Sequence, residues 1–197
     1  RAAEISDDDP DINLRLGDAR LATGDLQGAV VAYRAALSAD IHHSGALLGL
    51  GTAQLHLGKT ESAARNLQKA APELDTLAAW SRLGVARALL GQSQAAQRAF
   101  AHAVSLAPDE PDARTNLALA QALAGNTDDA VSQMRQVSAS PLAEERHFRN
   151  LILVLVLAGE GNQAANIEIP DMPESLRQSL IERAQRIQAI ADPGVRA

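Results

Sequence analysis

The fold is decided by a stretch in the middle of the chain, WSRLGVARALLGQSQAAQRAF, which occupies residues 80–100. In it the pair Leu83-Gly84 is followed by Gly91, then by Ala96 and Phe100. A glycine placed after a helical run supplies the left-handed conformation that ends a helix. Small residues before and after that turn let two helices approach closely, and the large apolar side chain fills the remaining space. The stretch therefore predicts a pair of antiparallel helices joined by a glycine turn.

The same pattern recurs along the chain at a nearly constant period, and the successive spacings are 34, 33, 34 and 34 residues. Recurrence at one period is the signature of a stacked helical array. The five leading pairs are Leu16-Gly17, Leu50-Gly51, Leu83-Gly84, Leu117-Ala118 and Leu151-Ile152, and the five turn glycines are Gly24, Gly58, Gly91, Gly125 and Gly159.

The composition agrees with an all-α fold and excludes several classes of function. The 197 residues include 40 Ala and 27 Leu, and only 2% are aromatic. Ala and Leu are strong helix formers, while the residues that strands prefer are scarce. The chain has no Cys, so it offers no disulfide or thiolate zinc site. The net charge of −6 argues against a nucleic-acid surface, and the longest apolar run, 151–158, is too short to span a bilayer.

The repeat pattern resembles the tetratricopeptide repeat (TPR), and the resemblance covers residues 10 to 168. It implies a right-handed superhelical solenoid of five helix-turn-helix repeats with a C-terminal capping helix. The aromatic residue that the consensus places three positions after the Leu-Gly pair is absent; Arg20, Gln54, Arg87, Gln121 and Leu155 stand there. We expect a single solenoid over 1–197, divided as follows: 1–9, the tail of a truncated earlier repeat; 10–43, 44–76, 77–110, 111–144 and 145–170, the repeats; 171–191, the capping helix; and 192–197, a tail.

The capping helix is expected to begin after an Asp cap at Asp171 and to cover the apolar edge of the fifth repeat. Its apolar residues fall at helical spacing, which predicts one buried face. The residues assigned to this face are Leu176, Leu180, Ala184, Ile187 and Ile190.

The first helix of each repeat should line the inner face of the superhelix, and this face is the candidate binding groove. Its predicted lining is mainly leucine, with acidic residues near its first end and arginines near its last. An apolar groove with charged ends suits an amphipathic partner helix. The alternative is that part of the stripe, Leu153, Val156 and Leu157, belongs to the core and is covered by the terminal helix. The predicted groove residues are Asp18, Leu48, Leu55, Val85, Leu89, Leu119, Leu123, Arg146 and Arg149.

Other residue groups that could carry chemistry have simpler explanations. His42, His43 and His56 lack a third ligand at helical spacing, so an inter-helix turn is favoured over a metal site. No strand precedes the glycines at 45, 49 and 51, which disfavours a phosphate loop. The acidic run 7–9 is typical of helix caps. The sequence predicts no catalytic residue, no metal site and no cofactor, and therefore a protein that is not an enzyme.

Two stretches point to a narrower family. RTNLALAQALAG at 114–125 is followed 34 residues later by the near copy RNLILVLVLAG at 149–159, with Pro141 between them and GLGTAQLHLG at 49–58 upstream. This doubled element resembles the TadD family, the TPR lipoproteins of the tight-adherence (Flp, type IVc) pilus machinery.

That resemblance implies a pilotin-like role, in which the protein binds a secretin subunit or its C-terminal tail and aids its localisation and assembly. It also implies a place on the periplasmic face of the outer membrane, with a lipid-bearing Cys upstream of Arg1 and no membrane insertion by this segment. Two alternatives stay open: a cytosolic TPR adaptor or co-chaperone, and a regulatory TPR segment of a larger protein.

Overall fold

The computed structural model describes residues 9–169 and 172–191, and all regular secondary structure in these ranges is α-helical. The chain divides into two compact units, residues 1–99 and 100–197, and the boundary falls within α6. The helices are α1 (Pro10–Ala22), α2 (Leu26–Ala39), α3 (Ser44–His56), α4 (Thr60–Leu74), α5 (Leu77–Leu89), α6 (Ser93–Leu106), α7 (Pro111–Leu123), α8 (Thr127–Ser138), α9 (Glu145–Leu157), α10 (Gly161–Ala165) and α11 (Glu174–Ala191).

Each predicted repeat contains a helix pair whose first member begins at the first residue of the predicted range, namely Pro10, Ser44, Leu77, Pro111 and Glu145. The five turn glycines have φ between 69° and 90°. This left-handed conformation strains residues that carry a Cβ, which explains why glycine recurs at this turn. The predicted helix-turn-helix repeats are thus confirmed, while the residues expected in the truncated earlier repeat, 1–8, lie outside the described ranges.

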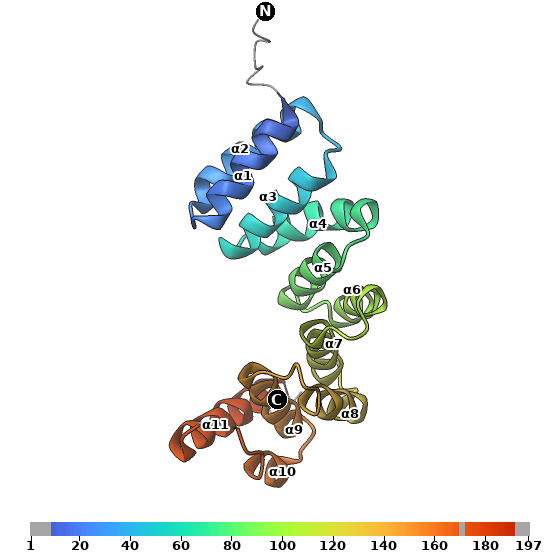
Figure 1. The fold of residues 1–197 in the computed structure, drawn as a ribbon. Coiled ribbons are helices and arrows are strands. Elements are labelled where there is room, and N and C mark those ends of the chain that lie inside the picture. The colour runs from blue at the N-terminus through green and yellow to red at the C-terminus, as the bar shows by residue number, and fades with distance from the viewer. Residues whose placement is uncertain (1–8, 170–171, 192–197) are drawn as a thin grey trace, which may run out of the picture. The chain divides into compact units, whose positions relative to one another are not determined.

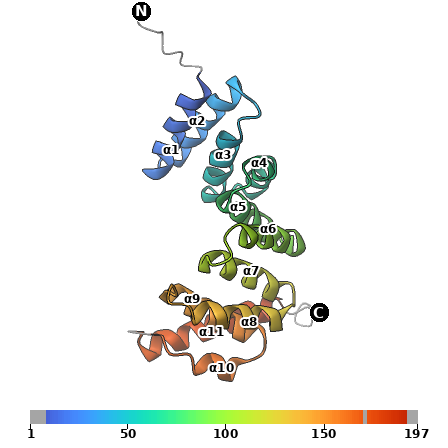
Figure 2. The same cartoon turned by 45° about the vertical axis from the view of Figure 1, so that its right-hand side comes forward.

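In the first unit, each helix packs on the next one along the chain from α1 to α5 (Figures 1 and 2). The helix α3 also packs on both α1 and α5, so the three first helices of these repeats lie side by side. One face of the unit is therefore built from first helices alone. This is the face on which the sequence places Asp18, Leu48, Leu55, Val85 and Leu89.

The core of the first unit depends on glycines that face large side chains. The ring of Tyr33 on α2 is fully buried, and a Cβ added to Gly17 on α1 or to Gly49 on α3 would overlap it. In the next repeat, a Cβ on Gly51 would lie 2.7 Å from Leu67 Cγ. The predicted close approach of paired helices through small residues is therefore confirmed, and Gly49 has a packing role that the repeat pattern alone does not show.

In the second unit, α9 is the central element, because α7, α8, α10 and α11 all pack against it. Its sequence is apolar on most sides, and Leu151, Ile152, Val154, Leu155 and Val156 are all buried. The reading of the fifth repeat as core is correct for Val156, and Leu153 and Leu157 are partly buried against the same cluster. An internal helix of this kind needs apolar residues on most of its circumference.

The end of the chain differs from the earlier repeats in the length of its second helix, and from the prediction in the buried face of α11. The second helix of the fifth repeat is only the short α10, which ends at Ala165, and Ile169 beyond it is buried in the core instead. On α11 the buried side chains are Ile181 and Ala184, whereas Leu176 and Ile187 are 42% and 41% exposed. The predicted face is therefore partly wrong: the helix is rotated so that Ile181 enters the core. Asp171 and the Ile190 side chain lie outside the described residues.

Candidate interaction surface

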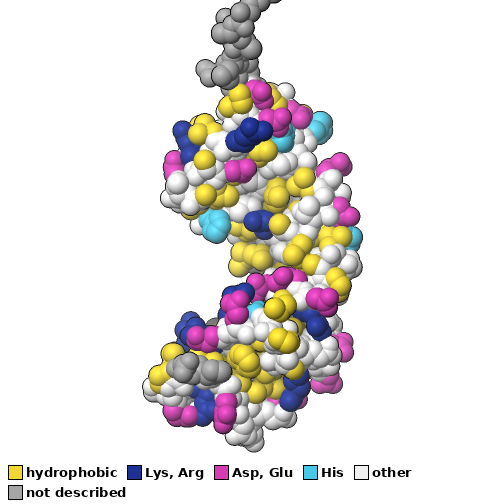
Figure 3. All heavy atoms as spheres, in the orientation of Figure 1, with side chains coloured by type: hydrophobic (Ala, Val, Ile, Leu, Met, Phe, Trp, Pro, Cys, Tyr) yellow, Lys and Arg dark blue, Asp and Glu magenta, His cyan; other side chains and the backbone are white. Residues whose placement is uncertain are grey.

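In the first unit, the predicted groove residues separate into packed and exposed side chains. Leu48 and Leu55 on α3 are partly buried and pack against the core formed by α4 and α5. On α5, Leu89 is 64% exposed and Val85 is 37% exposed. Figure 3 shows hydrophobic side chains gathered over α3 and α5. The structure therefore brings four of the predicted apolar residues onto neighbouring first helices, and Leu89 offers the largest free surface of the four.

The fifth predicted residue of this unit, Asp18 on α1, accepts a hydrogen bond of 2.8 Å from the Tyr33 hydroxyl. Burial, together with this contact, raises the pKa of Tyr33 well above its ordinary value of 10.0. Arg82 on α5 acts on the same phenol in the opposite direction. A negative side chain on α1 and a positive one on α5 thus share the electrostatic surroundings of one buried ring.

In the second unit, Leu123 on α7 is 52% exposed, whereas Leu119 is partly buried against the core around α9. The predicted arginines of α9 are exposed but already ion-paired. Arg146 binds Asp112 through Nε and Nη2, at 2.9 and 3.0 Å, and also contacts Glu144. Arg149 pairs with Glu145 at 2.5 Å. Both positive charges are therefore shared with carboxylates of this unit, and the groove as one continuous surface stays a prediction.

A buried histidine that the sequence analysis did not single out holds the same corner of the second unit. His147 is 1% exposed, and its Nδ1 accepts a 2.8 Å hydrogen bond from the Glu144 backbone N–H. The ring proton therefore resides on Nε2, which donates to Asp112 Oδ1 at 3.0 Å. Hydrogen bonds from Arg146 and His147 lower the pKa of Asp112 below its ordinary value of 3.8. This arrangement ties the start of α9 to the start of α7.

A second histidine–aspartate contact joins the first two repeats. His43 Nδ1 accepts from the Ala46 backbone N–H at 3.3 Å, so the ring caps α3. Its Nε2 lies 3.1 Å from Asp11 Oδ1 on α1. Asp11 and Asp112 occupy equivalent positions of their repeats, five residues before Leu16 and Leu117. The repeat alignment could have revealed the two aspartates, but the partner histidines stand at different repeat positions and give no such signal.

The sequence predicts an inter-helix turn for His42, His43 and His56. The structure refines this prediction, because His43 caps α3. Within the ranges 9–169 and 172–191, no three His, Asp or Glu side chains gather in a way that could hold a metal ion. The glycines at 45, 49 and 51 all lie inside α3, which leaves no loop there to cradle a phosphate.

Polar side chains take over the position from which the consensus aromatic is missing. Arg20 Nη1 donates to the Gly28 carbonyl at 3.0 Å, which links α1 to α2. Gln54 Oε1 accepts from Asn66 Nδ2 at 2.8 Å, which links α3 to α4. In the fifth repeat, Leu155 is completely buried instead. In the first, second and fifth repeats the two helices are therefore held together at this level by hydrogen bonds or by packing.

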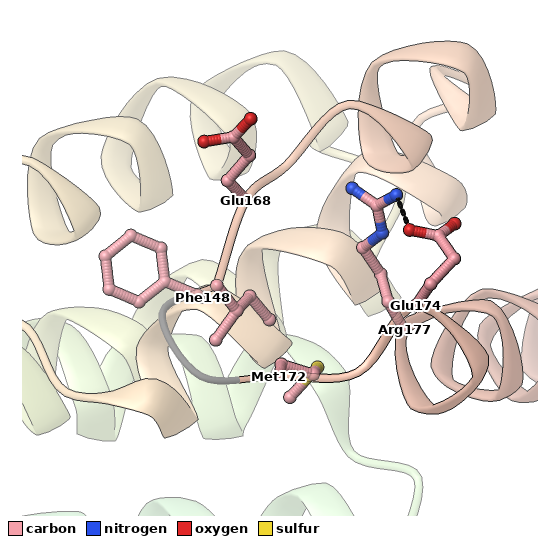
Figure 4. A pocket seen from close by; sticks show the side chains of 6 residues that line it. Phe148, Glu168, Met172, Glu174 and Arg177 are labelled. Carbon is pink, nitrogen blue, oxygen red and sulfur yellow. Dashed lines mark hydrogen bonds and ion pairs between the residues drawn. The ribbon is translucent and has the colours of Figure 1, made fainter.

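A pocket of about 540 Å³ lies in the second unit between α9, the segment after α10 and α11 (Figure 4). Phe148, Ile169 and Met172 form its apolar wall. Its cation, Arg177, donates to the Ile167 carbonyl at 3.1 Å and pairs with Glu174. Because Arg177 fastens α11 to the preceding segment, the charged part of this pocket has a structural explanation. None of the helices among the described residues has both the length and the apolar character needed to cross a bilayer.

Comparison with known families supports the repeat assignment. Two family models, both described as "Tetratricopeptide repeat", match residues 20–86 and residues 81–144. Together they cover the chain from the end of α1 to the turn after α8.

Solved structures show the same fold. A crystal structure of MamA protein has a TM-score of 0.68 and 22% identity over 92% of this chain and 94% of that one. A crystal structure of YrrB, described as a TPR protein with an unusual peptide-binding site, has a TM-score of 0.71 and 18% identity over 95% and 92% of the two chains. A TPR protein from Parabacteroides merdae has a TM-score of 0.74 and 17% identity over 95% and 77%. Because these sequence identities are low, the similarity shows a shared fold alone.

One curated relative matches along the sequence. Cellulose synthase 1 operon protein C of Komagataeibacter xylinus is 29% identical over 156 residues, which are 77% of this chain. The match spans only 12% of that relative's own length.

Proposed function

Because this chain is a member of the tetratricopeptide-repeat family, we propose that it is a non-enzymatic scaffold that holds an apolar segment of a protein partner against its first helices. One observation carries this proposal. Leu89 and Leu123, at the ends of α5 and α7, are 64% and 52% exposed. The leucines that begin the repeat pattern on the same helices, Leu83 and Leu117, are buried. Large apolar side chains kept on the surface of a stable fold are typical of interaction sites.

The partner favoured by the sequence is a secretin subunit, bound through an extended or helical tail in the assembly of a tight-adherence pilus. The support is the element RTNLALAQALAG at 114–125 with its near copy RNLILVLVLAG at 149–159, which share NLxLxxxLAG and resemble the TadD family. On this proposal, the protein acts as a pilotin on the periplasmic face of the outer membrane. Its lipid anchor lies upstream of Arg1, and Leu48, Leu55, Leu89, Leu119 and Leu123 contact the tail.

The experiment is co-purification of the secretin subunit with a Leu89→Glu/Leu123→Glu variant. A carboxylate at each exposed leucine places charge where an apolar partner would dock, so secretin capture should be lost while helical circular dichroism is unchanged. The matched control is Val31→Glu/Leu142→Glu, because both residues are 63% exposed and lie outside the first helices. Unchanged capture by the Leu89→Glu/Leu123→Glu variant would rule out the proposed contact.

A second candidate is a TPR segment of a larger protein with a role in a cellulose synthase operon. It is favoured by the match to Cellulose synthase 1 operon protein C, of which the aligned part is 12%. A third, a cytosolic adaptor or co-chaperone, follows from the repeat class alone. The gene sequence ahead of Arg1 separates them. A lipidation Cys there supports the pilotin, further repeats support the segment, and an immediate start codon supports the adaptor.

A further inference from the structure

Arg82 on α5 carries a positive charge that no contact within the described part of the chain neutralises. The residue is partly buried, yet within residues 9–169 and 172–191 no hydrogen bond or ion pair joins its guanidinium to another group. A guanidinium has five N–H donors, and a charge that is partly removed from water is normally paired. The side chain of Arg82 is therefore available to a carboxylate that a partner brings.

The other arginines of the same ranges differ from Arg82 in this respect. Each of the others that is partly buried donates to an acceptor of the chain itself. These are Arg20, which donates to the Gly28 carbonyl, Arg87 to Gln68 and Gln92, Arg114 to Gln136, and Arg177 to the Ile167 carbonyl and Glu174. Arginines without a partner, such as Arg34 on α2, are exposed and solvated by water.

Arg82 belongs to the side of α5 that the proposed partner contacts. Val85 and Leu89 follow it at spacings of three and four residues, so the three side chains lie along one side of the helix. Val85 and Leu89 are both exposed, and Figure 3 shows a positively charged side chain amid the hydrophobic ones over α3 and α5. This stripe of α5 (Arg82, Val85 and Leu89) is therefore cationic at one end and apolar at the other.

The acidic residue on the same face, Asp18 on α1, is engaged elsewhere. Its Oδ1 accepts the hydrogen bond from the Tyr33 hydroxyl at 2.8 Å, and no ion pair links it to Arg82. The charge of Arg82 favours a lower pKa of Tyr33, against the effects of burial and Asp18. A carboxylate that binds Arg82 therefore displaces no ion pair already present on this face.

We propose that Arg82 determines the specificity of this face by pairing with an acidic side chain of the bound segment. This inference rests on the proposed function, in which an apolar segment lies on the first helices. The pair fixes the position of the segment, because a large apolar residue one or two turns of α5 further on then meets Val85 or Leu89. Arginine binds a carboxylate through two parallel hydrogen bonds, so Glu or Asp is preferred there over Gln, and Lys is repelled.

The acid belongs to the interior of the segment rather than to its C-terminus. Leu48 and Leu55 on α3 and the stripe of α5 lie on neighbouring first helices. A segment that follows both sets of apolar side chains passes Arg82 instead of ending there. A peptide with an amidated C-terminus should therefore bind as well as one with a free carboxylate.

Selection from a random peptide library on the full chain tests the acidic requirement. The probe is a phage-displayed library whose peptides are fused to the coat protein at their C-termini. Enriched peptides should share large apolar residues together with one Glu or Asp. On Arg82→Glu, the same library should return Lys or Arg in place of the acid. Arg34→Glu is the matched control, because Arg34 is exposed and lies on a second helix, and it should return the same peptides as the unmodified chain.

Synthetic peptides measure the size of the charge preference. An amidated peptide from the selection is made with Glu, Gln or Lys at the acidic position, and its affinity is measured by fluorescence anisotropy. Replacing Glu by Lys should weaken binding to the unmodified chain about tenfold, a modest effect for a charge pair at an interface, and on Arg82→Glu the order should reverse. Arg82→Gln, which is neutral, should bind all three peptides with nearly equal affinity. Leu89→Glu should bind none of them.

The outcomes separate this inference from the proposed function. Enrichment of apolar peptides without an acid, or a preference for Glu that persists in Arg82→Gln, would overturn the role of Arg82 and leave the apolar contact intact. No enrichment of apolar peptides, or binding that survives Leu89→Glu, would count against both. Circular dichroism shows whether each variant is folded, and if Arg82→Glu is not, the comparison with Arg82→Gln decides alone.

Discussion

The Tyr33 hydroxyl donates a 2.8 Å hydrogen bond to Asp18 Oδ1, which connects the second helix of the first repeat to the exposed face of its first helix. The ring of Tyr33 is fully buried, while Asp18 is exposed. One side chain therefore fills the core and at the same time fixes the orientation of a carboxylate on the proposed interaction surface. The chain contains a single tyrosine, so this contact can be followed without interference.

Tyrosine ionisation should occur at higher pH than in a free phenol. The pKa of Tyr33 is raised above 10.0 by burial and by the Asp18 contact. Its contribution to stability is therefore complete below pH 10 and is lost as the pH rises through the raised pKa. Absorbance at the tyrosinate band should show this late titration, and urea should shift it back toward the ordinary value. A midpoint at the ordinary value in the folded protein would contradict the contact.

Replacing Tyr33 by Phe should cost about 1 kcal/mol of unfolding free energy, the usual net value of one hydrogen bond. Asp18→Asn is the matched variant, because the amide oxygen can still accept from the phenol, and it should lose less. Urea denaturation followed by circular dichroism measures both. Equal stability of the unmodified chain and the Phe variant would show that the hydrogen bond contributes nothing.

Gly49→Ala should destabilise the fold although alanine favours helices. The added Cβ would overlap the buried Tyr33 ring, and overpacking of this kind costs about 1–3 kcal/mol, against a helix-propensity gain of up to about 1 kcal/mol. Gly161→Ala is the control, because no heavy atom lies within 4 Å of a Cβ built there. Thermal unfolding should give a lower Tm for the first variant and an unchanged or higher Tm for the second.

The corner around Asp112 should be sensitive to acid. Its pKa is held below 3.8, chiefly by Arg146, so the ionised carboxylate stabilises the fold above pH 3.8 and this contribution disappears as the pH falls through the lowered pKa. Asp112→Asn should lose at most about 1 kcal/mol at neutral pH, because the ion pair is half exposed. The difference from the unmodified chain should shrink at acid pH, as measured by urea unfolding at both pH values.

Asp112→Ala should cost more than Asp112→Asn, since it leaves the buried Nε2–H of His147 without its acceptor. An unpaired buried donor costs about 1–3 kcal/mol. Urea unfolding measures the loss of unfolding free energy in both variants. Equal losses would show that the contact between Asp112 and His147 does not stabilise the fold.

Asp75 should tolerate asparagine but not alanine. It ends α4 with φ at 44°, a left-handed conformation, and its Oδ1 accepts from Trp80 Nε1 at 2.9 Å. Asparagine tolerates that conformation and keeps the oxygen. Alanine loses the acceptor and adds backbone strain, for a cost of about 1–3 kcal/mol. Fluorescence of Trp80, the single tryptophan, reports both unfolding and the loss of the contact.

The helix pairs could be predicted from the sequence because each repeat restates the same local physics. A glycine turn such as Gly91 and a small–large contact such as Gly51 with Leu67 depend on neighbours within one repeat, and five copies make the pattern visible. The side of α11 that enters the core could not be predicted, because Ile181 and Ile187 are equally apolar. The choice depends on how α9 and α10 are placed.

The candidate surface was partly predictable for a similar reason. Periodicity placed Leu89 and Leu123 on first helices, but it could not distinguish them from Val156, which is buried. Nor could it show that Arg146 is bound to Asp112, which lies 34 residues earlier in the chain. In the contacts between repeats, Asp112 has an equivalent in Asp11, but its partner His147 occupies a position that three earlier repeats give to alanine and so carries no periodic signal.

The fit of Tyr33 against Gly49 limits how this chain can be edited. The ring belongs to one repeat and the glycine that admits it belongs to the next. Removing residues 44–76 as a whole repeat would preserve the period, yet it would bring Arg82, the equivalent residue of the following repeat, to the place of Gly49. The repeats are therefore not interchangeable cassettes, and an in-frame deletion, duplication or shuffling of them must carry each complementary pair of residues across the junction.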